Sequence, residues 1–247
     1  MSAVHVGGTY KITGAARHTA ADDLLLKHVD MSRCTLVDIG ASDGSTSLDL
    51  LDRLPDDLGA YVIADLYLAL RHTVAGRVDL FFDPAGDCVL VVGRRLLAWP
   101  QLSWLGRVAG AAALLRARRA HARDEEVVLL NPDVRRRMAQ DPRLTARVHD
   151  VFQPWTDEPP DVVKVANLLR RLYFSDEEIT RALRQLLAAL PEGGHLLVVD
   201  NPRIEGIDLR GGLFQRRDAR FVTVATTDHP PEILELVEAV RLPGPVA

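Results

Sequence analysis

The residues whose spacing best fits a chemical task lie in one octapeptide, VDIGASDG, which ends at Gly44. An acidic residue, Asp38, stands two positions before Gly40, and the small residues Ser42 and Gly44 follow at alternate positions. Glycines let the backbone approach a ligand closely, and a helix start behind them offers N–H groups to a polar or anionic group. The pattern therefore predicts a loop for a nucleotide-like cofactor, and the alternative is an ordinary strand–turn–helix corner.

A short strand and a helix must position this loop. The apolar segment 35–39 predicts the strand, and the leucines after Ser47 predict the helix.

Two other nucleotide-binding loops fit less well. A P-loop needs a Gly-Lys-Ser/Thr ending, and a dinucleotide loop needs glycines where this chain has Ser42 and Ser45. A nicotinamide-dependent oxidoreductase is therefore a weaker alternative.

Composition excludes several classes of protein. The 247 residues are 47% hydrophobic with a net charge of −4, which fits one large α/β domain and argues against a dedicated nucleic-acid binder. The two cysteines, Cys34 and Cys88, form no metal spacing and no disulfide framework. The N-terminus has no secretory pattern, and no apolar run reaches the roughly 18 residues of a membrane span. We therefore expect a cytoplasmic protein without a metal.

Strand and helix patterns alternate along most of the chain. A capping box at Ser175 predicts the start of a helix, because its side chain and that of Glu178 can satisfy each other's backbone N–H groups. The alternation predicts a doubly wound, mainly parallel sheet with helices on both faces, in a single domain over 1–247 with an N-terminal arm and lid helix at 1–30. Further strands are predicted at 61–65, 146–151, 161–167, 195–200 and 221–226, and further helices at 20–29, 134–140 and 231–240.

One stretch, 66–124, departs from this alternation and is interpreted as an insertion. Two β-rich runs, 78–82 and 88–92, flank a Pro–Gly turn and predict a β-hairpin. The apolar and basic segment 99–123 follows and predicts a helix that begins at Ser103. This helix is interpreted as a lid or a dimerisation surface, which leaves a homodimer open. The alternatives are an ordinary covering helix and a helix on a membrane surface.

The octapeptide resembles the first motif of the class I S-adenosylmethionine-dependent methyltransferases, (V/L)-(L/V/D)-D-x-G-x-G-x-G, with Ser42 at the middle glycine. Weaker agreement covers 35–65 and 125–201. The resemblance implies a Rossmann-like methyltransferase fold, S-adenosyl-L-methionine as cofactor and methyl transfer to a small-molecule acceptor. The segment NLLR stands where methyltransferases of nucleic-acid and protein amino groups carry (D/N)-P-P-(Y/F), which argues against those substrates. The alternative is a catalytically silent binding or scaffold protein of the same fold.

The resemblance also implies the cofactor contacts. Asp65 ends the predicted second strand and is expected at the ribose, because a carboxylate can accept hydrogen bonds from both hydroxyls. If 126–130 is the second strand instead, the ribose contact moves to Asn131. The complete expected set is Asp38, Gly40, Ala41, Ser42 and Gly44 around the methionine part, Asp65 on the ribose, Asp150 and Val151 at the adenine, and Asn167 at the end of strand four.

No pattern ranks a general base for the transfer. The candidates are His149, His18 and Tyr173, and a transfer driven by positioning alone is also open, because the chemistry belongs to the cofactor. The residues expected to face the substrate follow strand four, and they are Asn167, Arg170 and Tyr173.

Overall fold

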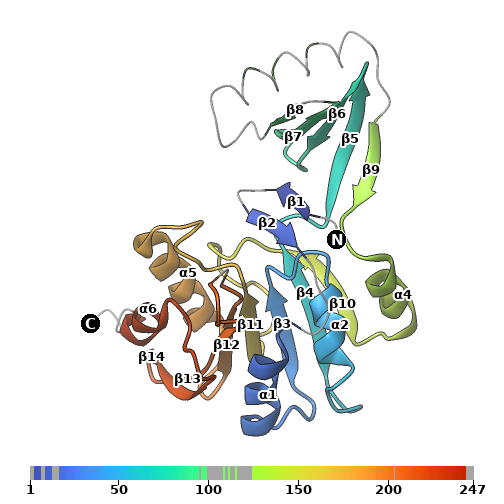
Figure 1. Ribbon diagram of the computed structural model, residues 1–247. Helices are drawn as coiled ribbons and strands as arrows, with labels where there is room; N and C mark the ends of the chain where they lie inside the picture. Colours follow the sequence, from blue (N-terminus) through green and yellow to red (C-terminus); the bar gives the residue numbers. More distant parts are fainter. Residues whose placement is uncertain are drawn as a thin grey trace. The chain divides into compact units, whose positions relative to one another are not determined.

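The computed structural model describes residues 3–6, 9–12, 17–94, 96–98, 124–202 and 204–242, together with 108, 111 and 115. The chain divides into two compact units (Figure 1). Residues Gly14–Leu66 and Asn131–Ala247 form the core unit, and Met1–Thr13 and Tyr67–Leu130 form the inserted unit. The expected N-terminal arm, 1–30, is therefore shared between the two units.

The core unit is built on a seven-stranded sheet in the order β10-β4-β3-β11-β12-β13-β14. The first five strands in this order are parallel, whereas β13 is antiparallel to both of its neighbours. The strands are β3 (Thr35–Ile39), β4 (Ala60–Asp65), β10 (Leu144–Val148), β11 (Val162–Ala166), β12 (His195–Asp200), β13 (Arg210–Arg217) and β14 (Arg220–Thr226). The predicted mainly parallel α/β fold is confirmed. The order in which the chain adds strands across the sheet reverses between β3 and β11, and ligands of open α/β sheets bind at such a switch point.

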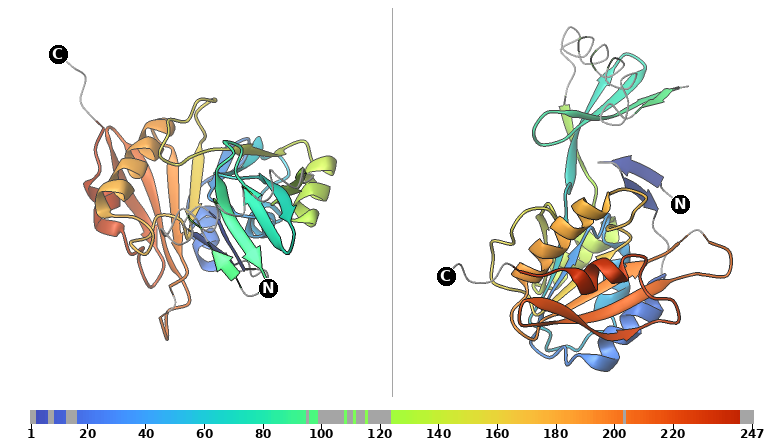
Figure 2. Two further views of the ribbon diagram at one scale, coloured as in Figure 1. Left: turned by 90° about the horizontal axis from the view of Figure 1, so that it is seen from above. Right: turned by 90° about the vertical axis from the view of Figure 1, so that its left-hand side faces the viewer.

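The helices of the core unit cover both faces of this sheet (Figure 2). The capping box at α5 is present, with the Glu178 N–H donating to Ser175 Oγ and the Ser175 N–H donating to Glu178 Oε2. The helices are α1 (Thr19–His28), α2 (Ser45–Leu51), α4 (Pro132–Gln140), α5 (Asp176–Ala189) and α6 (Leu234–Ala239). In the described part of the chain, no helix combines the length and the apolar character that crossing a bilayer requires.

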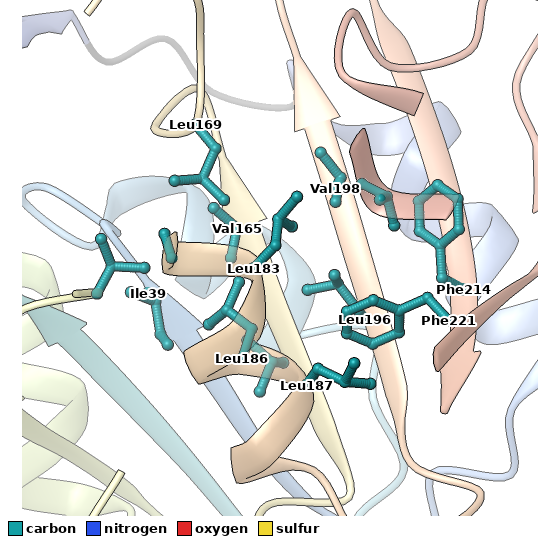
Figure 3. Close-up of a cluster of buried hydrophobic side chains, with 14 of the residues drawn as sticks. Ile39, Val165, Leu169, Leu183, Leu186, Leu187, Leu196, Val198, Phe214 and Phe221 are labelled. Carbon is teal, nitrogen blue, oxygen red and sulfur yellow. The ribbon is translucent and has the colours of Figure 1, made fainter. Parts of the chain in front are cut away.

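One face of the sheet packs against α5 and α6 in the main hydrophobic core (Figure 3). Leu183 and Leu186 of α5 point toward Val165 of β11, and Phe214 and Phe221 close the core beside α6. These leucines recur at helical spacing on one side of α5 and are completely or almost completely buried. Burial against this core orients the five parallel strands, so that their carboxyl ends share one edge.

The other face carries a buried ion pair. Lys164 points away from its core-facing neighbours because side chains alternate along a strand. Its Nζ lies 2.7 Å from Asp22 Oδ1 of α1, with side-chain exposures of 0% and 3%. Asp38 of β3 is opposite Lys164 in the strand register, and its Oδ2 accepts hydrogen bonds from Ser47 Oγ and Tyr61 OH. Burial raises the pKa of both aspartates, and the Lys164 charge opposes that rise.

The inserted unit contains a five-stranded antiparallel sheet in the order β8-β7-β6-β5-β9. The predicted hairpin is confirmed as β6 and β7. The strands are β5 (Ala69–Ala75), β6 (Val78–Phe82), β7 (Cys88–Gly93), β8 (Leu96–Ala98) and β9 (Asp124–Val128), and a separate hairpin joins β1 (Ala3–Val6) to β2 (Thr9–Ile12). The helix predicted from Ser103 within the segment 99–123 lies outside the described residues, apart from 108, 111 and 115.

We expect Lys164→Met to lower the free energy of unfolding by about 3–5 kcal/mol, because it leaves two carboxylates buried without their cation. The matched control is Arg136→Met, which removes an ion pair with Asp133 whose side chains are 73% and 62% exposed. That change should cost about 0.2–1 kcal/mol. Urea unfolding followed by circular dichroism measures both. Equal losses in the two variants would show that the buried pair is not important for the fold.

Candidate functional site

The loop between β3 and α2 has an unusual backbone. Gly40, Ser42 and Gly44 have φ values of 76°, 63° and 77°, so alternate residues are left-handed. A Cβ at Gly40 would lie 2.8 Å from Leu168 Cδ2, and one at Gly44 would lie 3.0 Å from Ile63 Cδ1. Ser42 adopts the same conformation with a side chain, at a cost of about 1–2 kcal/mol. The small residues that the sequence places at alternate positions are thus required by the backbone.

The carboxyl end of β4 holds this loop in place. Asp65 is 7% exposed, and its Oδ2 accepts the Ser42 N–H at 2.7 Å. The Gly40 N–H donates to the Ala64 carbonyl oxygen at 2.8 Å. A carboxylate has about four lone-pair positions, so holding Ser42 leaves Asp65 capacity for further donors. Asp65 therefore lies at the end of the strand beside β3, where a ribose contact is expected.

The structure does not support the alternative ribose contact at Asn131. Residues 126–128 belong to β9, which is antiparallel to β5 in the inserted sheet, so 126–130 is not the second strand of the core sheet. Asn131 instead caps α4, and its Oδ1 accepts the Asp133 N–H at 2.8 Å. Its Nδ2 donates to Ser45 Oγ at 2.9 Å. The alternative strand is therefore wrong, and Asn131 fastens α4 to the glycine loop.

The segment after β10 lies beside Asp65. The His149 N–H donates to the Asp65 carbonyl oxygen at 3.0 Å. The His149 ring contacts Trp155 edge-on, and burial, together with the charge of Arg147, lowers its pKa. Asp150 accepts the N–H of the residue two positions on, and the Val151 side chain is buried in the main core. The expected adenine segment thus follows the strand next to β4.

Asn167 follows β11 at the centre of the sheet, and it has a left-handed φ of 57°. Its side chain bridges two elements. Oδ1 accepts the Asn201 N–H at 2.7 Å, while Nδ2 lies 2.9 Å from Asn201 Oδ1 and 3.1 Å from His18 Nε2. His18, at the start of α1, is 4% exposed. Burial lowers its pKa to about 3, with further lowering by Lys164 and Arg17, which makes His18 a weak proton acceptor.

Sequence reasoning missed Asp200, the last residue of β12. It is buried, and its Oδ1 lies 3.6 Å from Nε of Arg170. Burial raises the pKa of Asp200 to about 6, against the opposing charge of Arg170. An acidic residue that ends the apolar run LLVVD was the available signal. Of the expected substrate contacts, Arg170 follows β11 and its side chain lies beside Asp200, and Tyr173 is half-buried against Phe174.

Several buried polar atoms at this end of the sheet have no hydrogen-bond partner within the described residues. They include His18 Nδ1, Asp38 Oδ1, Ser42 Oγ and Asp200 Oδ2. Each such atom costs about 1–3 kcal/mol if it stays unsatisfied, so native proteins usually supply a ligand or water. The described residues contain no cluster of three or more side chains arranged to hold a metal ion. The donors and acceptors present fit an organic polar ligand.

Comparisons with solved structures find several methyltransferases among the matches. No family model and no curated protein matches the chain. Among solved structures, the mitomycin 7-O-methyltransferase MmcR is 20% identical with a TM-score of 0.37, over 76% of this chain and 37% of that one. SAM-bound CalS10, an amino pentose methyltransferase from Micromonospora echinaspora, is 15% identical with a TM-score of 0.37, over 84% and 59%.

The N-methyltransferase NodS from Bradyrhizobium japonicum WM9, in complex with S-adenosyl-L-homocysteine, is 15% identical with a TM-score of 0.39, over 74% of this chain and 59% of its own. This chain thus spans less than two thirds of each of these three proteins. The Rossmann-like α/β architecture follows from the strand order itself.

We expect Gly40→Ala to destabilise the protein more than Gly193→Ala. Both replace a left-handed glycine, which costs about 1–2 kcal/mol, but a Cβ at Gly193 has open space. The contact with Leu168 adds about 1–3 kcal/mol at Gly40. Urea unfolding of both variants measures the difference. The double variant Gly40→Ala with Leu168→Ala tests the cause, since truncation should relieve the contact. Identical losses for the two single variants would contradict the close packing at Gly40.

We expect the stability of the wild-type chain, relative to Asp200→Asn, to fall as pH rises from about 4 to 6. The pKa of Asp200 is raised from 3.8 to about 6 on folding, so the folded state holds this proton more tightly than the unfolded state. Below the pKa of the unfolded state, Asp200 makes its full contribution to the free energy of unfolding. This contribution is lost as the pH rises through the pKa of the folded state, and the total loss is about 3 kcal/mol. Urea unfolding across this pH range measures the difference, and a flat difference would contradict the shift.

Proposed function

We propose that this chain is a class I S-adenosylmethionine-dependent methyltransferase that acts on a small molecule. The observation that carries the proposal is the glycine loop, with left-handed residues at 40, 42 and 44, held at the switch point of a parallel sheet by Asp65. Ligands of open α/β sheets bind at the carboxyl ends of the strands at such a point. The unsatisfied polar atoms of His18, Asp38 and Ser42 support a polar ligand there.

Each part of the cofactor has residues that would hold it. Asp65 would accept the ribose hydroxyls, and the backbone of 40–44 would surround the methionine part. Asp150 and Val151, which follow the strand beside β4, would meet the adenine, the latter through its backbone because its side chain is buried in the core. When bound, S-adenosylmethionine supplies a methyl group on a sulfonium, which is reactive without help from the protein.

The other polar residues of the site are assigned to positioning, proton transfer or binding. Asp38 lies beneath the loop, where Ser47 and Tyr61 hold one of its oxygens, so we assign it to the shape of the β3 end as well as to the methionine side. Asp200 joins His149 and Tyr173 as a candidate base, because a pKa of about 6 suits proton transfer near neutral pH. His18, with a pKa of about 3, is better suited to binding.

A small-molecule acceptor is supported by the chain's own residues. The segment after β11 reads NLLR, without the Asn/Asp-Pro-Pro-aromatic arrangement that methyltransferases of amino groups in nucleic acids and proteins carry. The net charge of −4 does not favour a nucleic-acid substrate, whose phosphates attract basic surfaces. We therefore place the acceptor among small molecules and leave the atom that receives the methyl group to substrate screening.

Calorimetric titration with S-adenosylhomocysteine tests the proposal. We expect micromolar binding by the wild-type chain and about 10–100-fold weaker binding by Asp65→Ala, because hydrogen bonds to a charged acceptor are worth about 1.5–3 kcal/mol. Asp65→Asn keeps one acceptor for the Ser42 N–H and separates loosening of the loop from loss of the ribose contact. Asp157→Ala, an exposed aspartate in an ion pair with Arg147, is the control and should bind like wild type.

Three outcomes distinguish the alternatives. Absence of binding by the wild-type chain overturns the proposed function. Binding of the cofactor without turnover of any acceptor, in assays with isotopically labelled methyl groups, favours a catalytically silent binding or scaffold protein. Binding of NADH in place of S-adenosylhomocysteine, followed by fluorescence, would favour a nicotinamide-dependent oxidoreductase.

A further inference from the structure

The side-chain amide of Asn201 has only one consistent orientation. One of its terminal atoms lies 3.0 Å from the carbonyl oxygen of Arg17 and 3.0 Å from that of Asp208. A carbonyl oxygen can only accept, so this atom is the nitrogen, Nδ2, and both contacts are hydrogen bonds that it donates. The oxygen of the same amide, Oδ1, therefore faces Asn167.

The orientation of Asn167 follows independently. One terminal atom of its amide lies 2.7 Å from the backbone nitrogen of Asn201. A backbone N–H can only donate, so this atom is Oδ1. The nitrogen of Asn167 then donates to Asn201 Oδ1 at 2.9 Å and to His18 Nε2 at 3.1 Å. Both asparagines are thus oriented by backbone groups, whose donor and acceptor roles cannot exchange.

These orientations favour one tautomer of His18. Since Nε2 accepts from Asn167, it must present a lone pair. The ring is neutral, because burial and two cations lower its pKa to about 3 against a smaller opposing contribution from the Asn201 side chain, and a neutral imidazole carries one proton. That proton is therefore on Nδ1. The side chain is almost completely buried, and Nδ1 has no hydrogen-bond partner within the described residues.

The surroundings of the ring favour a negatively charged partner. Lys164 and Arg17 both act electrostatically on His18, and both lower its pKa. The potential at the ring is therefore positive, and an N–H donor in a positive, water-poor site attracts an anionic acceptor. Contacts also connect the ring with the glycine loop. Asn167, which contacts His18, precedes Leu168, the residue that packs against Gly40 of the loop.

We propose that His18 binds the carboxylate of the cofactor's amino-acid part through Nδ1–H, and that Asn167 and Asn201 act as positioning residues that hold the required tautomer. This inference rests on the proposed function and extends it, because it assigns a specific donor to one group of S-adenosylmethionine. It also explains why a histidine unsuited to proton transfer occupies a buried position at the carboxyl ends of β11 and β12.

Paired titrations of the full chain test this assignment. S-adenosylhomocysteine carries the carboxylate, whereas 5′-methylthioadenosine shares the adenosine and lacks the amino-acid part. We expect His18→Phe, which keeps an aromatic ring without the donor, to bind S-adenosylhomocysteine about 10–100-fold more weakly. Its affinity for 5′-methylthioadenosine should stay within about twofold of wild type. The control is His28→Phe, an exposed histidine at the other end of α1, which should match wild type for both ligands.

The outcomes separate the two proposals. If the wild-type chain binds neither ligand, the proposed function fails, and this assignment fails with it. If the wild-type chain binds both and His18→Phe weakens both equally or neither, the assignment alone is overturned. Circular dichroism of His18→Phe checks that the variant folds.

A measurement on the wild-type chain covers the case in which His18→Phe does not fold. In ligand-free protein with ¹⁵N-labelled histidine, nuclear magnetic resonance should show His18 protonated on Nδ1. Adding S-adenosylhomocysteine should shift this Nδ1 resonance, and adding 5′-methylthioadenosine should leave it almost unchanged. A proton on Nε2, or a resonance that S-adenosylhomocysteine does not move, would contradict the assignment.

Discussion

The hydrogen bond from the Ser42 N–H to Asp65 is the contact on which the candidate site depends. It joins the ends of two neighbouring strands and holds a loop in which alternate residues are left-handed. Such a loop is strained wherever a side chain is present, so surrounding contacts must maintain it. Leu168 packs against Gly40 on one side, and Val134 of α4 packs against Gly44 on the other. Residues of β4, of the segment after β11 and of α4 thus hold the loop that follows β3.

A single buried cation links the stability of the core unit to the character of this site. Lys164 holds α1 on the sheet through Asp22, and it also opposes the rise in the pKa of Asp38. The same charge lowers the pKa of His18, one residue before α1. Replacing both Lys164 and Asp22 by apolar residues could be at least as stable, since buried ion pairs are rarely the most stable choice. It would also remove the positive potential beside the ligand end of the sheet.

Local patterns in the sequence were sufficient for much of the fold. The glycine loop, the capping box at Ser175 and the hairpin of the inserted unit depend on residues close together in the chain. Asp65 could also be placed, because an acidic residue at the end of a buried strand is a local signal. These features confirm the α/β fold class, whereas the contacts of Asp65 and the other site residues with a cofactor stay predictions.

The rest depended on contacts between distant residues. The pair of Lys164 and Asp22 spans 142 positions, and the contact of His18 with Asn167 spans 149. No periodicity reports such pairs, so His18 looked like a candidate base until its burial was known. The segment 126–130 shows the same limit. Its composition suits a strand in either sheet, and only its pairing with β5 places it in the inserted unit.

The pairing of β5 with β9 makes the segment Tyr67–Leu130 a self-contained module. The chain enters the inserted sheet through β5 and leaves through β9, and the Leu129 N–H donates to the Leu68 carbonyl oxygen at 2.8 Å. A segment whose ends touch adds little closure entropy to the sheet that hosts it. Evolution could therefore lengthen, exchange or discard this module as one piece, and a short turn from β4 to α4 would restore the connection without rethreading any strand of the parent fold.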